Sequence, residues 1–378
     1  MYYKCEYYQN IPIEDCENET VKILKKDDPL HLHKSFAHYS PTPIILLKDL
    51  SHKLGIKELW VKDESKRFNL QAFKVLGASY AIHKFLQKNK GNYIFCTATD
   101  GNHGTAVAWA SKLFHQKAKI FVPEYTVNSR IKKIENEGAK VVIVKGNYDK
   151  TVRVATEEAN KHGYHLIQDT SWKGYTKIPA LITAGYTTIF REMENIINLP
   201  GKPEIDMILI QAGVGSLASA AVYYYRNRYQ NNCPRIICVE PTEADCLLES
   251  VKHNKIRTSR KSQRTIMTGL NCGTPSLIAW QILKRGVDLF ISIPDPYTIK
   301  AMQLLYYPEG KDVQILSGES GAAGLGGLIA LLTNPDLNEI KQKISLNKSS
   351  KVLIFNTEGI TDPIHFNKLI KMNKINHL

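Results

Sequence analysis

The sequence predicts an α/β protein of two three-layer domains with largely parallel twisted sheets. Strand-like and helix-like segments alternate along most of the 378 residues, and this order is typical of parallel sheets covered by helices. A chain of this length is long enough for two packed domains. Several predicted strands end in glycine-rich or polar turns that open a helix, where open α/β sheets bind ligands.

Short apolar runs rich in β-branched and aromatic residues predict the strands. They are expected at residues 58–62, 93–96, 119–122, 140–144, 165–169, 206–211, 235–240, 289–292 and 352–355. Longer segments with helical apolar spacing predict the helices between them. These are expected at residues 73–88, 104–114, 129–137, 178–193 and 216–225. Residues 1–40 are irregular and are expected to wrap the outside of the molecule.

Composition narrows the class of partner. The formal charge of +14 raises the possibility of a nucleic-acid partner, but the basic residues are scattered, and the denser patch at 252–264 is expected to be a mobile surface loop. The apolar runs are far too short to span a bilayer, and residues 1–8 lack the apolar core of a signal peptide. A cytoplasmic protein is expected, acting on a small molecule rather than on nucleic acid or a membrane.

The seven cysteines show no C-x-x-C pairing, which argues against a zinc site and against a secreted disulfide scaffold. His31 and His33 are too sparse to indicate a metal site. No metal is expected.

Lys74 lies among Ala72, Phe73, Val75 and Leu76, so its ammonium is expected to be buried. Burial lowers a lysine pKa and leaves a neutral amine that can form a Schiff base. The alternative is a lysine whose head reaches solvent from an apolar helix start.

Two turns follow strands and open helices, where backbone N–H groups and the helix dipole favour anions. The first, residues 97–104, carries Asp100 and Asn102; the alternative is an ordinary strand–turn–helix in which Asp100 is the helix N-cap. The second, residues 211–219, offers a glycine cradle for a single phosphate. It is neither G-x-G-x-x-G, because residue 218 is alanine, nor a Walker A loop. The glycine-rich stretch 317–327 fits close helix packing and site lining equally well, and Thr357 ends the last strong strand.

This combination of lysine, asparagine turn, glycine turn and late hydroxyl resembles the fold type II family of pyridoxal phosphate enzymes, from about Pro41 to Pro363. More narrowly, the sequence is similar to the diaminopropionate ammonia-lyase family. The similarity is carried by residues 62–68, 72–74, 100–104, 168–175, 178–179, 317–322 and 357–359. Asn69 and Gln71 depart from it, because Gly and Asn stand at these positions in the family pattern.

The resemblance implies an active site in the cleft between two domains: a larger cofactor-anchoring domain of residues 1–78 and 196–378, and an inserted α/β domain of residues 79–195. It also implies a homodimer. Lys74 would form the Schiff base with pyridoxal 5'-phosphate, Asn102 would hydrogen-bond the phenolic oxygen, and Thr357 would face the pyridine nitrogen. The phosphate would be held by Gly213, Val214, Gly215, Ser216 and Leu217.

Asp100 distinguishes the chain from related dehydratases, which usually carry a small hydroxyl residue at this position. Two carboxylates, Asp100 and Asp169, suit a diamino acid, and the family's reaction converts D- and L-2,3-diaminopropionate to pyruvate and two ammonia. Because they lie at different strand ends, they are predicted to approach the α-carbon from opposite faces, Asp100 for the D form and Asp169 for the L form. A serine/threonine dehydratase or β-replacement enzyme of the same fold is the alternative.

Cys246 and Cys272 flank the basic segment 252–264 and lie in stretches that match the family. A disulfide that closes this segment is predicted, and two free thiols are the alternative.

Overall fold

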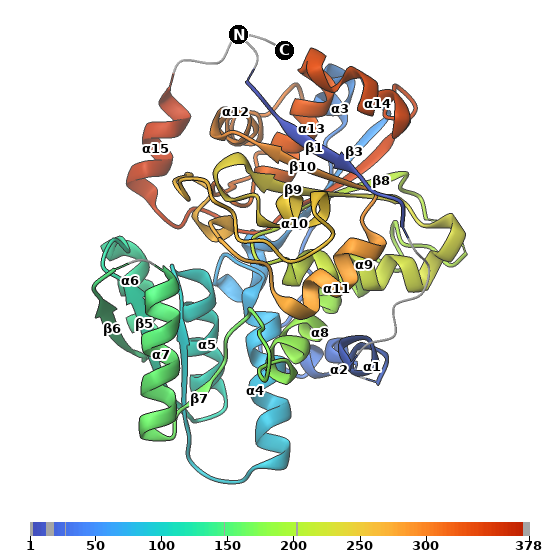
Figure 1. Cartoon of the computed structure of the whole chain (residues 1–378). Coiled ribbons are helices and arrows are strands. Elements are labelled where there is room, and N and C mark those ends of the chain that lie inside the picture. Colours follow the sequence, from blue (N-terminus) through green and yellow to red (C-terminus); the bar gives the residue numbers. More distant parts are fainter. Residues whose placement is uncertain (1–2, 13–18, 27, 147, 202, 373–378) are drawn as a thin grey trace.

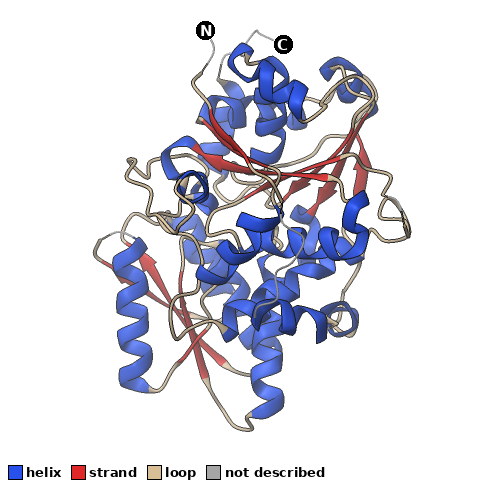
Figure 2. Cartoon of the chain, turned by 45° about the vertical axis from the view of Figure 1, so that its right-hand side comes forward, coloured by secondary structure: helices blue, strands red, loops and turns tan. Residues whose placement is uncertain are grey.

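The computed structural model of the chain describes residues 3–12, 19–26, 28–146, 148–201 and 203–372. In these parts the chain forms two separate sheets surrounded by helices (Figure 2). The α/β class and the largely parallel sheets are confirmed. None of the described helices is long and apolar enough to cross a membrane.

The larger sheet has seven strands in the order β1-β10-β9-β8-β11-β3-β2. Its five inner strands are parallel, and the two edge strands are antiparallel to their neighbours. The inner strands are β3 (Glu58–Asp63), β8 (Met207–Gln211), β9 (Arg235–Pro241), β10 (Leu289–Ile293) and β11 (Lys351–Asn356). The edge strands are β1 (Glu6–Gln9) and β2 (Ile44–Leu46).

Helices cover both faces of this sheet, because successive side chains of a strand point to opposite faces. In β8, Met207 and Leu209 face one core, and Ile208 and Ile210 face the other. The first core lies under α3 (Lys48–Leu54), α12 (Asp295–Tyr306), α13 (Ala323–Thr333), α14 (Asn338–Lys343) and α15 (Pro363–Lys371). The second lies under α4 (Lys74–Lys88), α8 (Lys177–Arg191), α9 (Ser216–Tyr229), α10 (Cys246–Lys252) and α11 (Leu277–Gly286).

The smaller sheet is entirely parallel, in the order β6-β5-β4-β7. Its strands are β4 (Ile94–Ala98), β5 (Lys117–Pro123), β6 (Lys140–Val144) and β7 (His165–Leu166). The helices α5 (Asn102–Leu113), α6 (Asn128–Asn136) and α7 (Tyr148–His162) surround it (Figure 1). All four strands lie within the predicted inserted domain. The predicted boundary at residues 78 and 79 stays a prediction, because α4 runs across it and packs on both α5 and α8.

The N-terminal region is more regular than expected, and the prediction of an irregular wrap is wrong. The strand β1 pairs with β10, and the region also contains α1 (Glu19–Lys26) and α2 (Pro29–Lys34). As an edge strand, β1 is half-buried or exposed and shows no apolar alternation, so the sequence offers no strand signal there. The basic segment 252–264 lies at the surface, and Lys252 and Lys261 pair with acidic residues. Its mobility stays a prediction.

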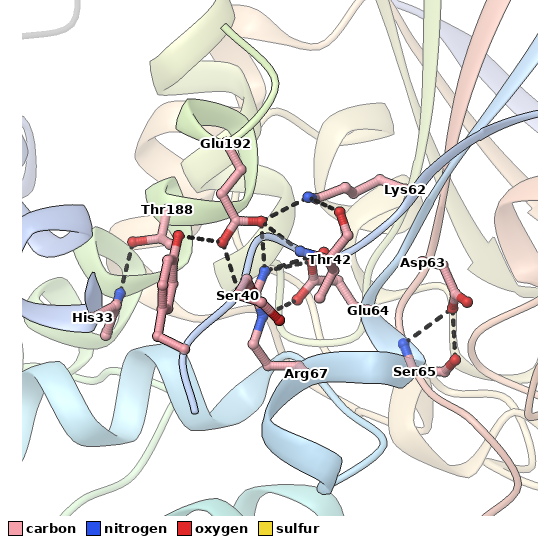
Figure 3. A network of polar contacts seen from close by, with 11 residues as sticks. His33, Ser40, Thr42, Lys62, Asp63, Glu64, Ser65, Arg67, Thr188 and Glu192 are labelled. Atoms are coloured by element: carbon pink, nitrogen blue, oxygen red, sulfur yellow. Dashed lines mark hydrogen bonds and ion pairs between the residues drawn. The ribbon is translucent and has the colours of Figure 1, made fainter. Parts of the chain in front are cut away.

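A buried ion network fixes the segment that leads to Lys74 (Figure 3). Glu192, just after α8, accepts hydrogen bonds from Lys62 at 2.6 Å and from Arg67 at 2.7 Å, and Arg67 also pairs with Glu64 at 2.8 Å. These side chains are at most 1% exposed. Burial raises the pKa of Glu192, but the two cations outweigh burial and bring it to about 2. The network therefore ties β3 and the turn η1 (Glu64–Asn69) to α8.

Immediately after this network the backbone is left-handed at three residues that are not glycine. Phe68, Asn69 and Gln71 have φ angles of 46°, 60° and 61°. Only Gly, and sometimes Asn or Asp, adopts this conformation readily. The two departures from the family pattern, Asn69 and Gln71, thus lie at positions of backbone strain just before Lys74.

Candidate active site

One pocket gathers all ten predicted site residues. Its lining combines turns that follow β4 and β7 of the smaller sheet with turns that follow β8 and β11 of the larger sheet. The carboxyl ends of parallel strands therefore face each other across the pocket, as expected for a ligand site in an α/β protein. The predicted residues in this lining are Lys74, Asp100, Asn102, Asp169, Gly213, Val214, Gly215, Ser216, Leu217 and Thr357.

Lys74 is the first residue of α4, and its Nζ forms an ion pair with Asp169 Oδ2. Burial by itself lowers the pKa of Lys74, but the Asp169 carboxylate outweighs burial, so the pKa is raised above its usual value. The prediction of a depressed lysine pKa is wrong because the sequence pattern shows burial but not the paired anion. In this state the amine is a charged ammonium held against Asp169.

Asp169 follows β7 and connects the two sides of the pocket. Its Oδ2 forms the ion pair with the Lys74 ammonium, and its backbone carbonyl accepts a hydrogen bond from the Ser216 hydroxyl at 2.7 Å. Burial raises the pKa of Asp169, but the positive charge of Lys74 outweighs burial and brings the pKa to about 2. Asp169 is therefore an anion throughout the neutral range.

Asp100 differs from Asp169 in its electrostatic environment. Burial raises its pKa to about 6, and Arg130 offsets only part of this effect. Asp100 does not cap α5, because the N-cap residue of this helix is Gly101. Thr99 instead accepts hydrogen bonds from the N–H groups of Gly101 and Gly104, at 2.9 and 3.1 Å. The N-cap alternative for Asp100 is thereby excluded, and its carboxylate lines the pocket.

Asn102 begins α5, and its amide donates to the carboxylate of Glu358. The other oxygen of Glu358 accepts from the Ser320 N–H at 3.0 Å. Glu358 is only 3% exposed and lines the pocket, although sequence reasoning assigned it no role. Its position directly after Thr357 was the available signal. Ser320 also lines the pocket, so the glycine-rich stretch 317–327 contributes to the site.

Thr357 is held by Gln211, the last residue of β8. The Gln211 amide nitrogen lies 2.9 to 3.0 Å from three backbone carbonyls, those of Ser320, Gly321 and Phe355. Carbonyls only accept hydrogen bonds, so they fix the orientation of this amide. Its nitrogen also lies 2.9 Å from the Thr357 hydroxyl oxygen. An amide nitrogen has two hydrogens and no acceptor, so the Thr357 hydroxyl cannot donate to it, and its O–H stays free to donate to another group.

The glycine turn opens α9 and packs tightly. Gly215 precedes the helix with a φ of 96°, which disfavours any other residue. A Cβ at Gly215 would lie 2.6 Å from Leu283 Cδ1, and one at Gly213 would lie 2.9 Å from Cys272 Sγ. The helix begins at Ser216, and the first N–H groups of a helix have no partner within it, so this end of α9 offers backbone donors and a positive dipole to the pocket. This arrangement fits one anionic group.

The predicted disulfide is wrong, because Cys246 and Cys272 are both free thiols in the structure. The Cys246 Sγ lies 3.8 Å from the Gly213 carbonyl oxygen, and Cys272 lines the pocket. Burial raises the pKa of Cys272 to about 12, which keeps this thiol protonated. Cys16 lies outside the described residues.

Comparison with known proteins gives the family. The family of pyridoxal-phosphate dependent enzymes matches residues 36–352. A diaminopropionate ammonia-lyase of Escherichia coli (strain K12) is 40% identical over 356 residues, 89% of each chain. One of Salmonella typhimurium is 37% identical, over 88% of this chain and 89% of its own.

Comparison with solved structures points to the same family. The holo diaminopropionate ammonia lyase of Escherichia coli has a TM-score of 0.88 and 36% identity, covering 98% of this chain and 97% of that chain. The same enzyme in complex with an aminoacrylate-PLP azomethine reaction intermediate has a TM-score of 0.87 at 36% identity and covers 98% of each chain. The chain belongs to the family of pyridoxal-phosphate dependent enzymes and, within it, groups with the diaminopropionate ammonia-lyases.

Proposed function

We propose that the protein catalyses the α,β-elimination of 2,3-diaminopropionate, in its D and L forms, to pyruvate and two ammonia with pyridoxal phosphate. The observation that carries this proposal is the pocket itself, in which a lysine and two carboxylates of different pKa face a helix N-terminus. The 40% identity to a diaminopropionate ammonia-lyase supports the same activity.

The residues present fit the cofactor. Gly213 and Gly215 leave room where a Cβ would meet neighbouring atoms, and with Val214, Ser216 and Leu217 they would bind the phosphate through the first turn of α9. Lys74 offers the anchoring amine, and Asn102 would approach the phenolic oxygen. When bound, the cofactor supplies an electron sink for the electron pair of the substrate α-carbon.

Thr357 would donate its hydroxyl hydrogen to the pyridine nitrogen. This role is supported by the contact with Gln211, whose amide nitrogen cannot accept the Thr357 O–H and so leaves it free to donate. A neutral hydroxyl keeps this nitrogen unprotonated, and the resulting moderate electron withdrawal suffices for elimination.

Asp100 and Asp169 would remove the α-proton from opposite faces, Asp100 from the D form and Asp169 from the L form. A base must lie on the same face as the proton that it removes, within hydrogen-bond reach. Both carboxylates line one pocket, and both are largely ionised at pH 7 given pKa values of about 6 and about 2. Either can also pair with the second ammonium of a diamino acid, which serine and threonine lack.

The proposal is tested by product counting. The purified protein is incubated with D- and L-2,3-diaminopropionate, serine and threonine, and ammonia and pyruvate are measured. Two ammonia per pyruvate from diaminopropionate are expected. A preference for serine or threonine, with one ammonia per keto acid, would identify the dehydratase alternative. Lys74→Ala is expected to abolish both turnover and the visible absorbance of bound cofactor, with an unchanged far-UV circular dichroism spectrum; retained absorbance would mean that another lysine anchors the cofactor.

We also infer that the protein works as a cytoplasmic homodimer. The free thiols support a reducing compartment. The resemblance to the family supports the dimer, and sedimentation of the purified protein tests it.

A further inference from the structure

The buried histidine of the active-site turn, His103, has one nitrogen without a partner. Its side chain lies in α5, 3% exposed, in the lining of the pocket. The Nε2 atom lies 2.7 Å from the carbonyl oxygen of Ile167. A carbonyl only accepts hydrogen bonds, so Nε2 must carry the hydrogen. Burial lowers the pKa of His103 and favours the neutral ring. The neutral ring then bears its lone pair on Nδ1.

The Nδ1 atom faces Asp169. It has no hydrogen-bond partner among the described residues, and it lies 3.9 Å from Asp169 Oδ2, the oxygen that holds the Lys74 ammonium. A lone pair and an ionised carboxylate are both acceptors, so they cannot bond without a proton between them. A hydrogen bond between Nδ1 and Asp169 can therefore form only when Asp169 is protonated. Asp169 is in this state after it has removed a proton from the substrate.

We propose that His103 is a positioning residue whose Nδ1 accepts a hydrogen bond from Asp169 once Asp169 has taken the α-proton of the L substrate. The inference rests on the proposed function. In this step the α-C–H bond breaks and the proton bonds to Asp169, while the C–N bond to the protonated β-amino group breaks and ammonia leaves with that electron pair; the bound cofactor would supply the electron sink. No oxidant or reductant is needed.

The hydrogen bond to His103 raises the proton affinity of Asp169, which the neighbouring ammonium lowers. The Lys74 ammonium favours the ionised carboxylate, and an anion stabilised in this way is a weak base. A neutral acceptor at His103 stabilises the protonated carboxyl instead. Asp100 has different neighbours, Arg130 and Tyr125, so the D substrate is expected to depend little on His103.

Two amide substitutions test the roles of the two ring nitrogens of His103 separately. His103→Gln keeps a donor near the Nε2 position for the Ile167 carbonyl but has no acceptor at the Nδ1 position. We expect kcat for L-diaminopropionate to fall about tenfold, the effect of one lost hydrogen bond, and kcat for the D form to fall much less. His103→Asn places an amide oxygen near Nδ1 and loses the bond to Ile167. We expect it to recover most of the L activity at a lower melting temperature.

A second measurement does not depend on turnover. In the ¹⁵N NMR spectrum of the histidine-labelled holoenzyme, the resonances lost in His103→Gln should show a protonated Nε2 and an unprotonated Nδ1. A protonated Nδ1, or equal losses of D and L activity in His103→Gln, overturns the inference and leaves the proposed function intact. A wild-type protein that releases no ammonia from either enantiomer overturns the proposed function, and the inference with it.

Discussion

The unequal pKa values of the two aspartates predict that the enantiomer preference changes with pH. A catalytic base must be ionised to accept a proton, so activity rises with pH through the pKa of the base. The pKa of Asp100 is about 6, because burial disfavours its charge, whereas the positive charge on the Lys74 nitrogen keeps the pKa of Asp169 low, at about 2 in this structure. Activity on the D form should therefore fall below pH 6, and activity on the L form should not.

The size of the effect follows from the ionised fraction. At pH 5, one unit below its pKa, Asp100 is ionised in roughly one molecule in ten, whereas Asp169 stays fully ionised. The ratio of kcat/KM for the D form to that for the L form should fall about tenfold between pH 8 and pH 5. The enantiomers ionise identically in solution, so the ratio cancels the titration of the substrate.

The assay is coupled detection of pyruvate from each enantiomer between pH 5 and pH 8. Arg130→Gln is the matched control. Arg130 lowers the pKa of Asp100, so its removal should move the midpoint of the pH profile for the D form to higher pH. Asp100→Asn should lose most activity on the D form and little on the L form. A ratio that is constant over this range, or equal losses in Asp100→Asn, would refute the assignment of one base to each enantiomer.

Four further substitutions, one of them a control, test the framework of the site. Gly215→Ala and Gly55→Ala both place a side chain at left-handed φ. Gly55→Ala should cost about 1 to 2 kcal/mol in thermal unfolding, and Gly215→Ala should cost more, because its Cβ would also meet Leu283; only Gly215→Ala should lower the cofactor content after dialysis. Glu192→Gln removes the anionic partner of the buried Lys62 and leaves Arg67 paired only with Glu64, and it should cost about 3 to 5 kcal/mol in urea unfolding. The folded-state pKa of Glu192 is depressed, so its contribution is full above pH 4.5 and is lost as the pH falls towards 2; Glu192→Gln should lack this part of the acid dependence. Gln71→Gly relieves the strain of a left-handed conformation, so it should raise the free energy of unfolding by about 0.5 to 1 kcal/mol and the melting temperature with it. A melting temperature below that of the wild type would show that the contact between Gln71 and Lys133 contributes more than the strain costs.

The sequence by itself determined the fold class and the members of the pocket. Strand, turn and helix follow one another over short distances, so the turns with Asn102 and Gly215 are encoded locally. Parallel strands then bring their carboxyl ends to one edge, which explains why residues far apart in the chain line a single pocket. The left-handed backbone at residue 215, with a φ of 96°, was also predictable in principle, because glycine is the residue that adopts this conformation most readily.

Only the tertiary structure decided the electrostatics of these residues. Lys74 and Asp169 are 95 positions apart, so no local pattern shows that their ion pair reverses the expected pKa shift of the lysine. The same reason applies to His103 and Gln211, whose partners lie on distant segments. Charge interactions and burial depend on distances in space, and a pKa, a tautomer or the direction of a hydroxyl is fixed only when distant segments have packed together.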